Sequence, residues 1–295
     1  MEIKNYLNSI LKKEKITDDS LEIKKLQAER GKVEKIITGY FEDKPVIRYA
    51  GSYKKDTMIK SSYDLDITCY FKYDDNSAGE TLGEIYENVK KSLENNYTIR
   101  EKKSALRLMG DGSIDFNIDV VPGRFVDDSQ NDVFLHQSSG EKDWMKTNLD
   151  KHVNHIKNSQ VNDTIKLVKL WRNIYAVDVK TFALELLVVK ILNKRKDSDG
   201  LTKCFTDFMG VIAESVDNIA IEDPANSGND LSNIFDSSVK NILLSAAQKT
   251  LEAINDDKWE DIFGAVVEES SEYKLKSVHS EYERTGNSPR PWLDI

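Results

Sequence analysis

Cysteine and proline are scarce in this chain, and no apolar run is long enough to cross a membrane. Two cysteines among 295 residues are too few for a disulfide framework or a zinc ribbon. Five prolines and 14 glycines argue against a fibrous or disordered chain. The stretch 1–20 is charged and holds no long apolar segment, so we expect neither a signal peptide nor a membrane-spanning helix. These absences favour a soluble protein of the cytoplasm.

Basic residues are also in the minority. Lysine and arginine number 42 against 51 aspartate and glutamate residues, which gives a formal net charge of −9. Binding to a long nucleic acid requires a broad basic face, so the composition argues against it. A small basic pocket for one nucleotide is compatible with this charge. The 39% of hydrophobic residues suffices for the core of one large domain or of two smaller ones.

The pattern of apolar residues changes near Trp144. Before this residue, helical periodicity over 20–41 and 81–94 alternates with short strand-like segments. Strands are expected over 46–50, 64–71, 97–102, 105–109 and 114–121. Beyond Trp144, helical patterns dominate. Helices are expected over 145–157, 164–175, 182–194, 201–214, 237–255 and 258–268. The order predicts an α+β chain, with a mixed sheet and flanking helices in residues 1–145 and an all-helical domain in residues 146–295.

Two carboxylates lie one residue apart in the apolar strand predicted over 64–71. Side chains alternate across a strand, so Asp64 and Asp66 point to the same face and repel one another. Taken alone, an Asp-x-Asp pair more often lies on a hydrated edge of a sheet than in a metal site. A divalent cation such as Mg²⁺ would remove the repulsion, because carboxylate oxygens are its preferred protein ligands. The residues around the pair decide between a hydrated edge and a metal site.

A third carboxylate occurs on a later predicted strand. Asp119 directly precedes the apolar stretch 120–122, where a surface charge is hard to explain. Asp115 shares its face of the strand but lies nearer the turn at 110–112, so we expect it to be hydrated. Asp119 is therefore the better candidate for a partner of the Asp-x-Asp pair.

A Gly-Ser pair follows the first predicted strand and precedes a short helical turn. Backbone N–H groups at such a start, together with the hydroxyl of Ser52, suit a phosphate oxygen. Gly51, Ser52 and the three carboxylates together predict a two-metal site for a nucleotide. Asp64 and Asp66 would bridge two Mg²⁺ ions, for which Mn²⁺ is a possible replacement. Asp119 would hold the catalytic ion and help to take a proton from an attacking hydroxyl.

The Gly-Ser pair, the Asp-x-Asp pair and the lone Asp119 together resemble the signature of the DNA polymerase β-type nucleotidyltransferases. The segments TIKLVKLWRN, KTFALELLVVK and IEDPANSGNDLS narrow the resemblance. They are similar to segments of the 2′-5′ oligoadenylate synthetases and of the CD-NTases of CBASS anti-phage systems, the bacterial relatives of cyclic GMP–AMP synthase. The resemblance covers residues 46–232. It implies a polymerase β-like core, an oligoadenylate synthetase-like helical domain and a cleft between them.

The resemblance also implies two nucleotide-binding residues in the helical half. In that family the Lys two positions before the Trp contacts the donor triphosphate, and here it is Lys169, before Trp171. The polar residue that opens the next helix also contacts phosphate, which points to Thr181. From the residues alone, Lys169 shares a polar stripe with Lys166 and Asn173, and such a stripe is also typical of a hydrated helix face. Thr181 is equally well explained as a helix N-cap.

The function implied by the resemblance is the joining of NTPs, ATP among them, into a cyclic oligonucleotide second messenger with release of pyrophosphate. The implied partner is a cyclic-nucleotide effector encoded elsewhere, and we expect a monomer that binds neither membranes nor extended nucleic acid. One alternative keeps the fold but makes linear products or uses a tRNA end, a protein or a small molecule as acceptor. Another is a non-catalytic nucleotide sensor, which the retained carboxylates disfavour.

Several residues are expected to have structural roles only. The Cys/His zinc module of the animal enzyme is absent, and His152 and His155 are expected to be ordinary surface residues without a third ligand. Cys69, within an apolar strand, is expected to be a core residue. The turn-rich stretch 222–230 is expected to form a loop. In the resembling families this loop returns toward the cleft, and the residues alone leave a structural role equally open.

Overall fold

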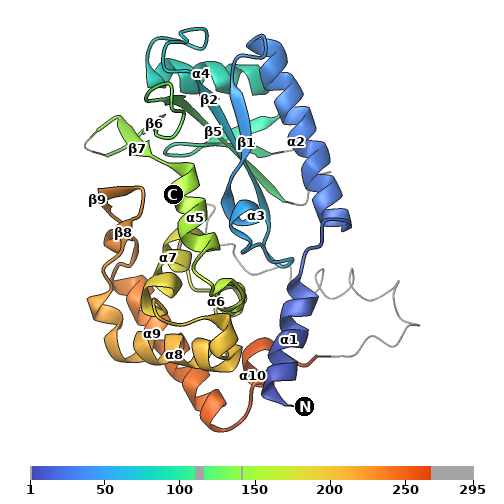
Figure 1. Cartoon of the computed structure of the whole chain (residues 1–295), viewed down its shortest axis with the longest axis vertical. Coiled ribbons are helices and arrows are strands. Elements are labelled where there is room, and N and C mark those ends of the chain that lie inside the picture. The colour runs from blue at the N-terminus through green and yellow to red at the C-terminus, as the bar shows by residue number, and fades with distance from the viewer. Residues whose placement is uncertain (1, 110–115, 141, 267–295) are drawn as a thin grey trace.

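The computed structural model describes residues 2–109, 116–140 and 142–266. Within them, a mixed sheet with its covering helices occupies one end of the molecule, and a group of packed helices occupies the other (Figure 1). None of the helices in these ranges is both long enough and apolar enough to cross a membrane. The α+β order expected from the sequence is confirmed.

The sheet has the strand order β1-β2-β5-β4-β3, and β6 and β7 extend it from β5. The strands are β1 (Val46–Tyr49), β2 (Asp64–Phe71), β3 (Thr98–Glu101), β4 (Leu106–Met109), β5 (Asn117–Phe125), β6 (Val133–His136) and β7 (Trp144–Thr147). β2 and β5 are parallel neighbours, while the other pairs of this sheet are antiparallel. A parallel pair needs a long crossover, and here α4, β3 and β4 provide it.

Helices α2 (Leu21–Tyr40) and α4 (Leu82–Leu93) cover one face of the sheet. Every second residue of β2, beginning with Leu65, packs into their apolar core. Cys69 belongs to this core and is fully buried, as expected. Because side chains alternate along a strand, Asp64 and Asp66 lie on the opposite face. The packing of α2 and α4 thus leaves the carboxylate face of β2 directed away from the apolar core.

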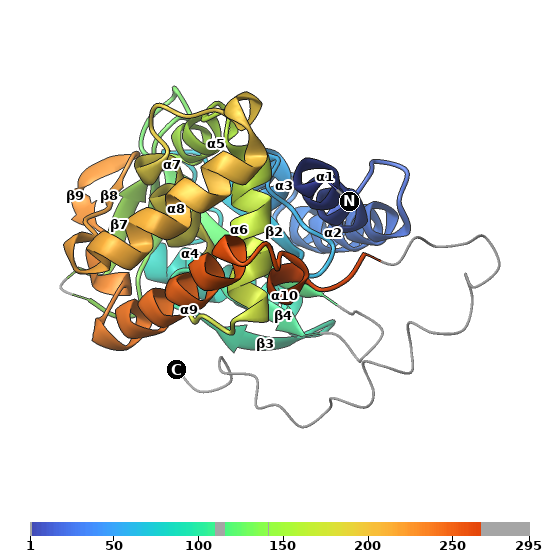
Figure 2. The same ribbon diagram turned by 90° about the horizontal axis from the view of Figure 1, so that it is seen from below.

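The second core lies among the helices that follow the sheet. They are α5 (Leu149–Lys157), α6 (Asn162–Ile174), α7 (Thr181–Ile191), α8 (Leu201–Ser215), α9 (Ser237–Asn255) and α10 (Glu260–Phe263). The helices α8 and α9 pack side by side (Figure 2). Trp171 is buried at the centre of this core, and its indole N–H donates a 2.8 Å hydrogen bond to Thr250 Oγ1. Short 3-10 turns span Asp197–Asp199, Val216–Asn218 and Ser232–Ile234.

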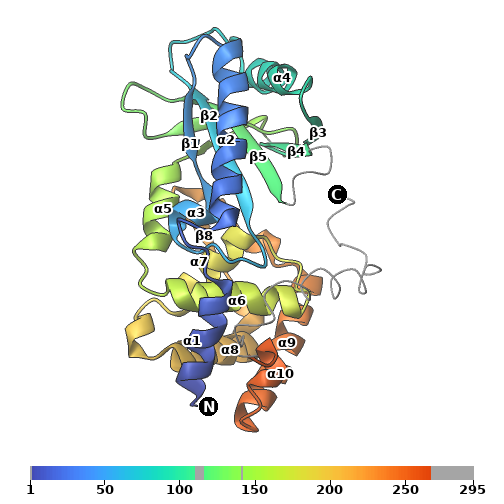
Figure 3. The same cartoon turned by 90° about the vertical axis from the view of Figure 1, so that its right-hand side faces the viewer.

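Helix α1 (Ile3–Glu14) precedes the sheet in the chain but packs with the later helices (Figure 3). Tyr6, Leu7 and Ile10 are buried in the helical core, and the Tyr6 hydroxyl donates to the Gly264 carbonyl at 2.7 Å. The division of the chain into residues 1–145 and 146–295 stays a prediction. In the structure, α1 contributes to the core of the second part rather than the first.

Three local predictions are wrong. The helix predicted over 258–268 covers only Glu260–Phe263 within the described residues. The helix predicted from residue 145 begins only at Leu149, because Trp144–Thr147 pairs with β6 and Asn148 then caps α5 by accepting from the Lys151 N–H at 2.9 Å. The stretch 222–230 is a small hairpin rather than a loop without strands. It is formed by β8 (Glu222–Asp223) and β9 (Asn226–Asp230). Asp115 lies outside the described residues.

Candidate active site

The three candidate carboxylates meet on the face of the sheet opposite to the apolar core formed with α2 and α4. Asp66 of β2 lies directly opposite Asp119 of β5 in the parallel register, and Asp64 lies opposite Asn117. Neighbouring strands are about 4.8 Å apart, so this register brings the three acids together. The Asn117 side-chain amide donates a 3.0 Å hydrogen bond to Asp64 Oδ1. The three acids that were singled out in the sequence therefore form one cluster in the structure.

The positive charges near Asp66, on Lys55 and Lys102, compensate its charge only in part. Burial raises its pKa to about 6, and the negative charges of Asp119 and Asp64 act in the same direction. A divalent cation bound by these oxygens would reverse this effect, because it favours the ionised carboxylates. The chemistry of Asp64 and Asp66 therefore fits a hard cation such as Mg²⁺.

Asp119 has a different environment, because two basic side chains hold it. Arg107 Nε and Nη2 each donate a 2.8 Å hydrogen bond to it, and Lys102 Nζ donates a third at 3.0 Å. Burial acts to raise the pKa of Asp119, but these bonds and charges outweigh it and the pKa is lowered. As the side chains lie, no three acids, histidines or cysteines among the described residues are arranged to hold a metal ion. Asp119 fits a metal only after these bonds have opened.

The sequence alone did not identify Arg107 or Lys102. Arg107 lies on β4 opposite Asp119 in the antiparallel register of β4 and β5. The only available signal was a basic residue on a strand that neighbours an acidic one. That signal becomes useful only when the strand order is known.

Gly51 and Ser52 begin the short helix α3 (Gly51–Lys55), next to the carboxylates. Gly51 has φ +65°, and a Cβ atom at this position would lie 1.7 Å from Asp66 Oδ2. Only glycine therefore permits both this backbone conformation and the close approach of α3 to Asp66. The Ala50 N–H also donates a 2.9 Å hydrogen bond to the Asp66 carbonyl. The Gly-Ser turn is thus packed directly against Asp66.

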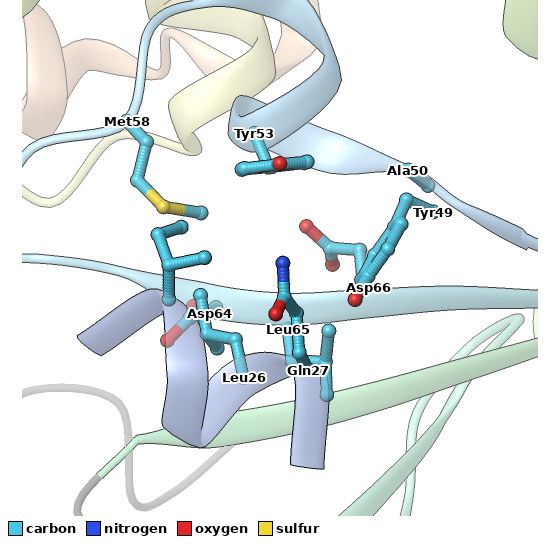
Figure 4. A pocket seen from close by; sticks show the side chains of 10 residues that line it. Leu26, Gln27, Tyr49, Ala50, Tyr53, Met58, Asp64, Leu65 and Asp66 are labelled. Atoms are coloured by element: carbon cyan, nitrogen blue, oxygen red, sulfur yellow. The ribbon is translucent and has the colours of Figure 1, made fainter. Parts of the chain in front are cut away.

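A narrow pocket opens beside Asp64 and Asp66, between α2, α3 and β2 (Figure 4). Its remaining lining is largely apolar and aromatic, with Leu26, Tyr49, Tyr53 and Met58 among its residues. The side chains of Tyr53 and Asp66 lie on facing sides of this pocket. The apolar lining limits the access of water to one flank of the carboxylate pair, in agreement with the raised pKa of Asp66.

Lys169 is buried, with 2% of its surface exposed. Its ammonium donates a 2.6 Å hydrogen bond to the Thr57 carbonyl and lies 3.9 Å from Glu185 Oε1. Burial lowers the pKa of Lys169 to about 8. A contact of Lys169 with a triphosphate stays a prediction, and it requires the bond to Thr57 to open. Lys166, from the same stripe, instead pairs with Asp163 at 3.1 Å on the outer side of α6.

Thr181 is the first residue of α7, and its predicted role as N-cap is wrong. The N-cap is Lys180, without a side-chain capping bond. The Thr181 hydroxyl instead accepts a 2.8 Å hydrogen bond from Arg172 Nη1. The predicted contact with phosphate stays a prediction.

His152 is not an ordinary surface residue. Its Nε2 lies 2.6 Å from Asp223 Oδ1, and its ring packs against Phe182 with the centroids 4.6 Å apart. Asp223 is almost fully buried and also accepts from Asn229 Nδ2 at 3.0 Å. The prediction failed because the sequence does not show which distant acid faces a histidine. His155, in contrast, is exposed as expected.

Residues 1–160 match the model of the Second Messenger Oligonucleotide or Dinucleotide Synthetase domain. The chain belongs to this family. The curated CBASS oligonucleotide cyclase CdnC of Escherichia coli (strain KTE188) is 26% identical over 198 residues. This match covers 60% of the present chain and 60% of that relative's length. The resemblance to the CD-NTases expected from the sequence is confirmed.

Two solved structures share the fold of this chain. CdnC of E. coli MS115-1, determined with ATP, has a TM-score of 0.68 at 18% identity, over 89% of this chain and 98% of that one. The di-nucleotide cyclase DncV of Vibrio cholerae, in complex with ATP and GTP, has a TM-score of 0.70 at 14% identity, over 88% and 95%. The likeness confirms the mixed sheet with flanking helices followed by a helical part.

Proposed function

We propose that this protein is a metal-dependent nucleotidyltransferase that joins NTPs into a cyclic oligonucleotide second messenger in CBASS anti-phage defence. The observation that carries the proposal is the parallel register of β2 and β5, which gathers Asp64, Asp66 and Asp119 beside the Gly51–Ser52 turn. Membership of the synthetase family and the name of the E. coli relative support it. We further propose that the protein acts as a cytoplasmic monomer and that a separately encoded effector binds its product.

Each residue of the site has a proposed task. Asp64 and Asp66 would hold two Mg²⁺ ions, with Mn²⁺ as a possible replacement, and Asp119 would join them once Arg107 and Lys102 release it. Bound there, the ions would neutralise charge on the triphosphate and make a ribose hydroxyl more acidic. Asp119 would help to accept the proton of that hydroxyl during its attack on the α-phosphate.

The remaining tasks concern the nucleotide itself. The backbone N–H groups at Gly51 and the hydroxyl of Ser52 would bind phosphate oxygens, since they lie at the start of a helix, where the first N–H groups have no partner within the helix. Lys169 and Thr181 are proposed as further phosphate contacts from the helical half. The leaving pyrophosphate would depart between the sheet and the helices.

The experiment that tests the proposal is incubation of the purified protein with labelled ATP, GTP, CTP and UTP in Mg²⁺ or Mn²⁺. Products are treated with phosphatase, separated and identified by mass. A phosphatase-resistant oligonucleotide is the expected result, and its mass gives the ring size and the bases. Products that remain sensitive to phosphatase would support a linear synthetase instead. Transfer to added RNA or protein alone would support the alternative acceptors.

The matched control is the double variant Asp64→Asn with Asp66→Asn. The substitutions remove charge but keep shape, so the fold is expected to persist while turnover is lost. Turnover at the wild-type rate in this variant would contradict the metal-dependent mechanism. Circular dichroism shows whether the fold is intact.

A further inference from the structure

Glu185 is a buried carboxylate to which the proposed reaction assigns no task. It lies on α7 and has no exposed surface. Its Oε2 accepts from Lys55 Nζ at 2.9 Å, and its Oε1 accepts from the Thr57 hydroxyl at 2.6 Å. Lys169 of α6 adds a second positive charge 3.9 Å from Oε1. Burying an ionised group is unfavourable unless partners surround it, and here both carboxylate oxygens have partners.

The partners of Glu185 come from one short segment near the carboxylates. Lys55 is the last residue of α3, and Thr57 follows two positions later. The same segment is held at two further points, because Lys169 Nζ donates to the Thr57 carbonyl at 2.6 Å and Asn162 Nδ2 donates to the Lys55 carbonyl at 3.0 Å. The helical half thus contacts the end of α3 and the residues after it at four points, two on their side chains and two on their backbone carbonyls.

The segment also contacts an aromatic ring of α7. The ammonium of Lys55 lies 4.5 Å from the centroid of the Phe182 ring. A cation at this distance from a ring face is attracted to it, especially where water is excluded. Lys55 is therefore fixed from two sides, by a charge and by a ring of the same helix.

The other end of α3 is the Gly51–Ser52 turn. α3 has five residues and is therefore about 7.5 Å long. At its start, Gly51 packs so closely on Asp66 that no side chain fits between them. A displacement of the Lys55 end would tilt this single turn of helix and move the phosphate-binding N–H groups relative to Asp66. Figure 3 shows α3 between the sheet and the helices α5 and α7.

We propose that Glu185 is a positioning residue, which holds α3 against the helical half so that the Gly51–Ser52 turn and Asp66 present a fixed site for the triphosphate of an NTP. The inference rests on the proposed function. It goes beyond that function by assigning the correct placement of the turn to a cluster on α6 and α7. Lys169 then acts through Thr57, whether or not it also touches a phosphate.

The test uses Thr57→Val, which removes the hydroxyl bond to Glu185 and leaves both buried lysines and the carboxylate in place. Glu185→Gln weakens the cluster more, but it leaves two buried lysines without their counter-charge. Such a variant can lose activity simply because it does not fold. The matched control is Thr250→Val, which removes the buried bond from Trp171 to α9 and none of the contacts of Glu185. Amide hydrogen exchange over residues 51–57 is measured without nucleotide, together with the Kd of a non-hydrolysable ATP analogue with Mg²⁺ and the steady-state KM and kcat.

We expect Thr57→Val to speed exchange over 51–57 and to weaken analogue binding, each by about five- to tenfold, the effect of one hydrogen bond. KM should rise more than kcat falls, and Thr250→Val should change none of these quantities. Unchanged exchange over 51–57 in Thr57→Val would overturn the inference. So would faster exchange with unchanged analogue binding, because the contact would then be structural only.

The two proposals fail in different ways. A wild-type protein that neither binds the analogue nor turns over any NTP contradicts the proposed function. Exchange over 51–57 still reports whether the Glu185 cluster holds α3, because it is measured without nucleotide. Equal effects of Thr57→Val and Thr250→Val would assign the loss to general destabilisation and would overturn the inference.

Discussion

Arg107 on β4 donates two hydrogen bonds of 2.8 Å to Asp119 on β5, one to each carboxylate oxygen. Paired arginine–carboxylate bonds of this kind are among the stronger polar contacts in proteins. The same oxygens are those that a divalent cation would need. Arg107 therefore occupies the Asp119 oxygens that the proposed metal ion would need, and binding of that ion would have to compete with it.

Lys102→Gln tests this competition with little risk to the fold, because 42% of the Lys102 side chain is exposed. Removing the ammonium frees Asp119 Oδ2 from one donor and makes the cluster more negative. We expect Mn²⁺ to bind a few times more tightly, a change of about 1 kcal/mol or less. The measurement is a titration of free Mn²⁺ by electron paramagnetic resonance, without nucleotide. Lys103→Gln makes the same charge change one residue away, and an equal gain there would show that net charge alone is responsible.

Gly51→Ala is expected to damage the site without unfolding the protein. A Cβ atom would collide with Asp66 Oδ2, so the carboxylate must turn away from its present position. The positive φ adds a backbone cost of about 1 kcal/mol. We expect turnover to fall by 100-fold or more, since misplacement by about 1 Å has this effect on catalysis. Steady-state kinetics and thermal unfolding measure the two effects.

The control for this substitution is Gly210→Ala, in the middle of α8. Apart from the adjacent residues and the backbone of α8 itself, no heavy atom lies within 4 Å of the added methyl group, and the backbone is helical. Alanine is the better helix former, so this variant should gain about 0.5–1 kcal/mol of stability and keep its activity. A loss of turnover at position 210 as large as that at position 51 would show that the protein is simply intolerant of such changes.

The raised pKa of Asp66 predicts how Mg²⁺ stabilisation depends on pH. In the folded protein Asp66 has a pKa of about 6, whereas its ordinary value is 3.8. The folded state then binds the proton more tightly than the unfolded state, so stability falls as pH rises from about 4 to about 6. The loss is at most about 3 kcal/mol, and less because Asp66 is partly exposed. The proposed Mg²⁺ would bind the ionised form and should restore this stability.

Thermal unfolding with Mg²⁺ and with EDTA, at pH 5 and pH 7.5, checks the predicted direction of this pH dependence. The increase in Tm caused by Mg²⁺ should be larger at pH 7.5 than at pH 5. In Asp66→Asn, the EDTA form should be more stable than wild type at pH 7.5, and the Mg²⁺ effect should shrink. A Mg²⁺ effect that is equal at both pH values would argue against Asp66 as a titrating ligand.

The sequence predicted those features that depend on nearby residues. β2 and α9 were predicted with their correct ends, because alternation and helical periodicity are local patterns. The carboxylates and the Gly-Ser turn were found for the same reason, since each is a short motif. Their proximity, however, needs the parallel pairing of β2 with β5.

The features that were missed depend on contacts between distant parts of the chain. Glu185 meets Lys55 across 130 residues, and nothing in the apolar helix around it indicates that an acid faces the end of α3. The polar stripe of α6 did not reveal that Lys169 faces a buried carboxylate instead of water. A periodic pattern identifies the polar side of a helix but does not identify its neighbour.

The pair of His152 and Asp223 joins α5 to the hairpin of β8 and β9, and its stability effect should depend on pH. Burial acts to raise the pKa of Asp223, but the hydrogen bond and charge of His152 outweigh it, and the pKa is lowered. The stabilisation is therefore present above the ordinary aspartate pKa and is lost as pH falls through the lower folded value.

Asp223→Asn should cost about 1–3 kcal/mol at pH 7, and clearly less at pH 3.5. Urea unfolding at the two pH values measures this, with the exposed neighbour Glu222→Gln as the control. An equal cost at both pH values would mean that Asp223 acts through its neutral hydrogen bonds to Ala225 and Asn229 alone.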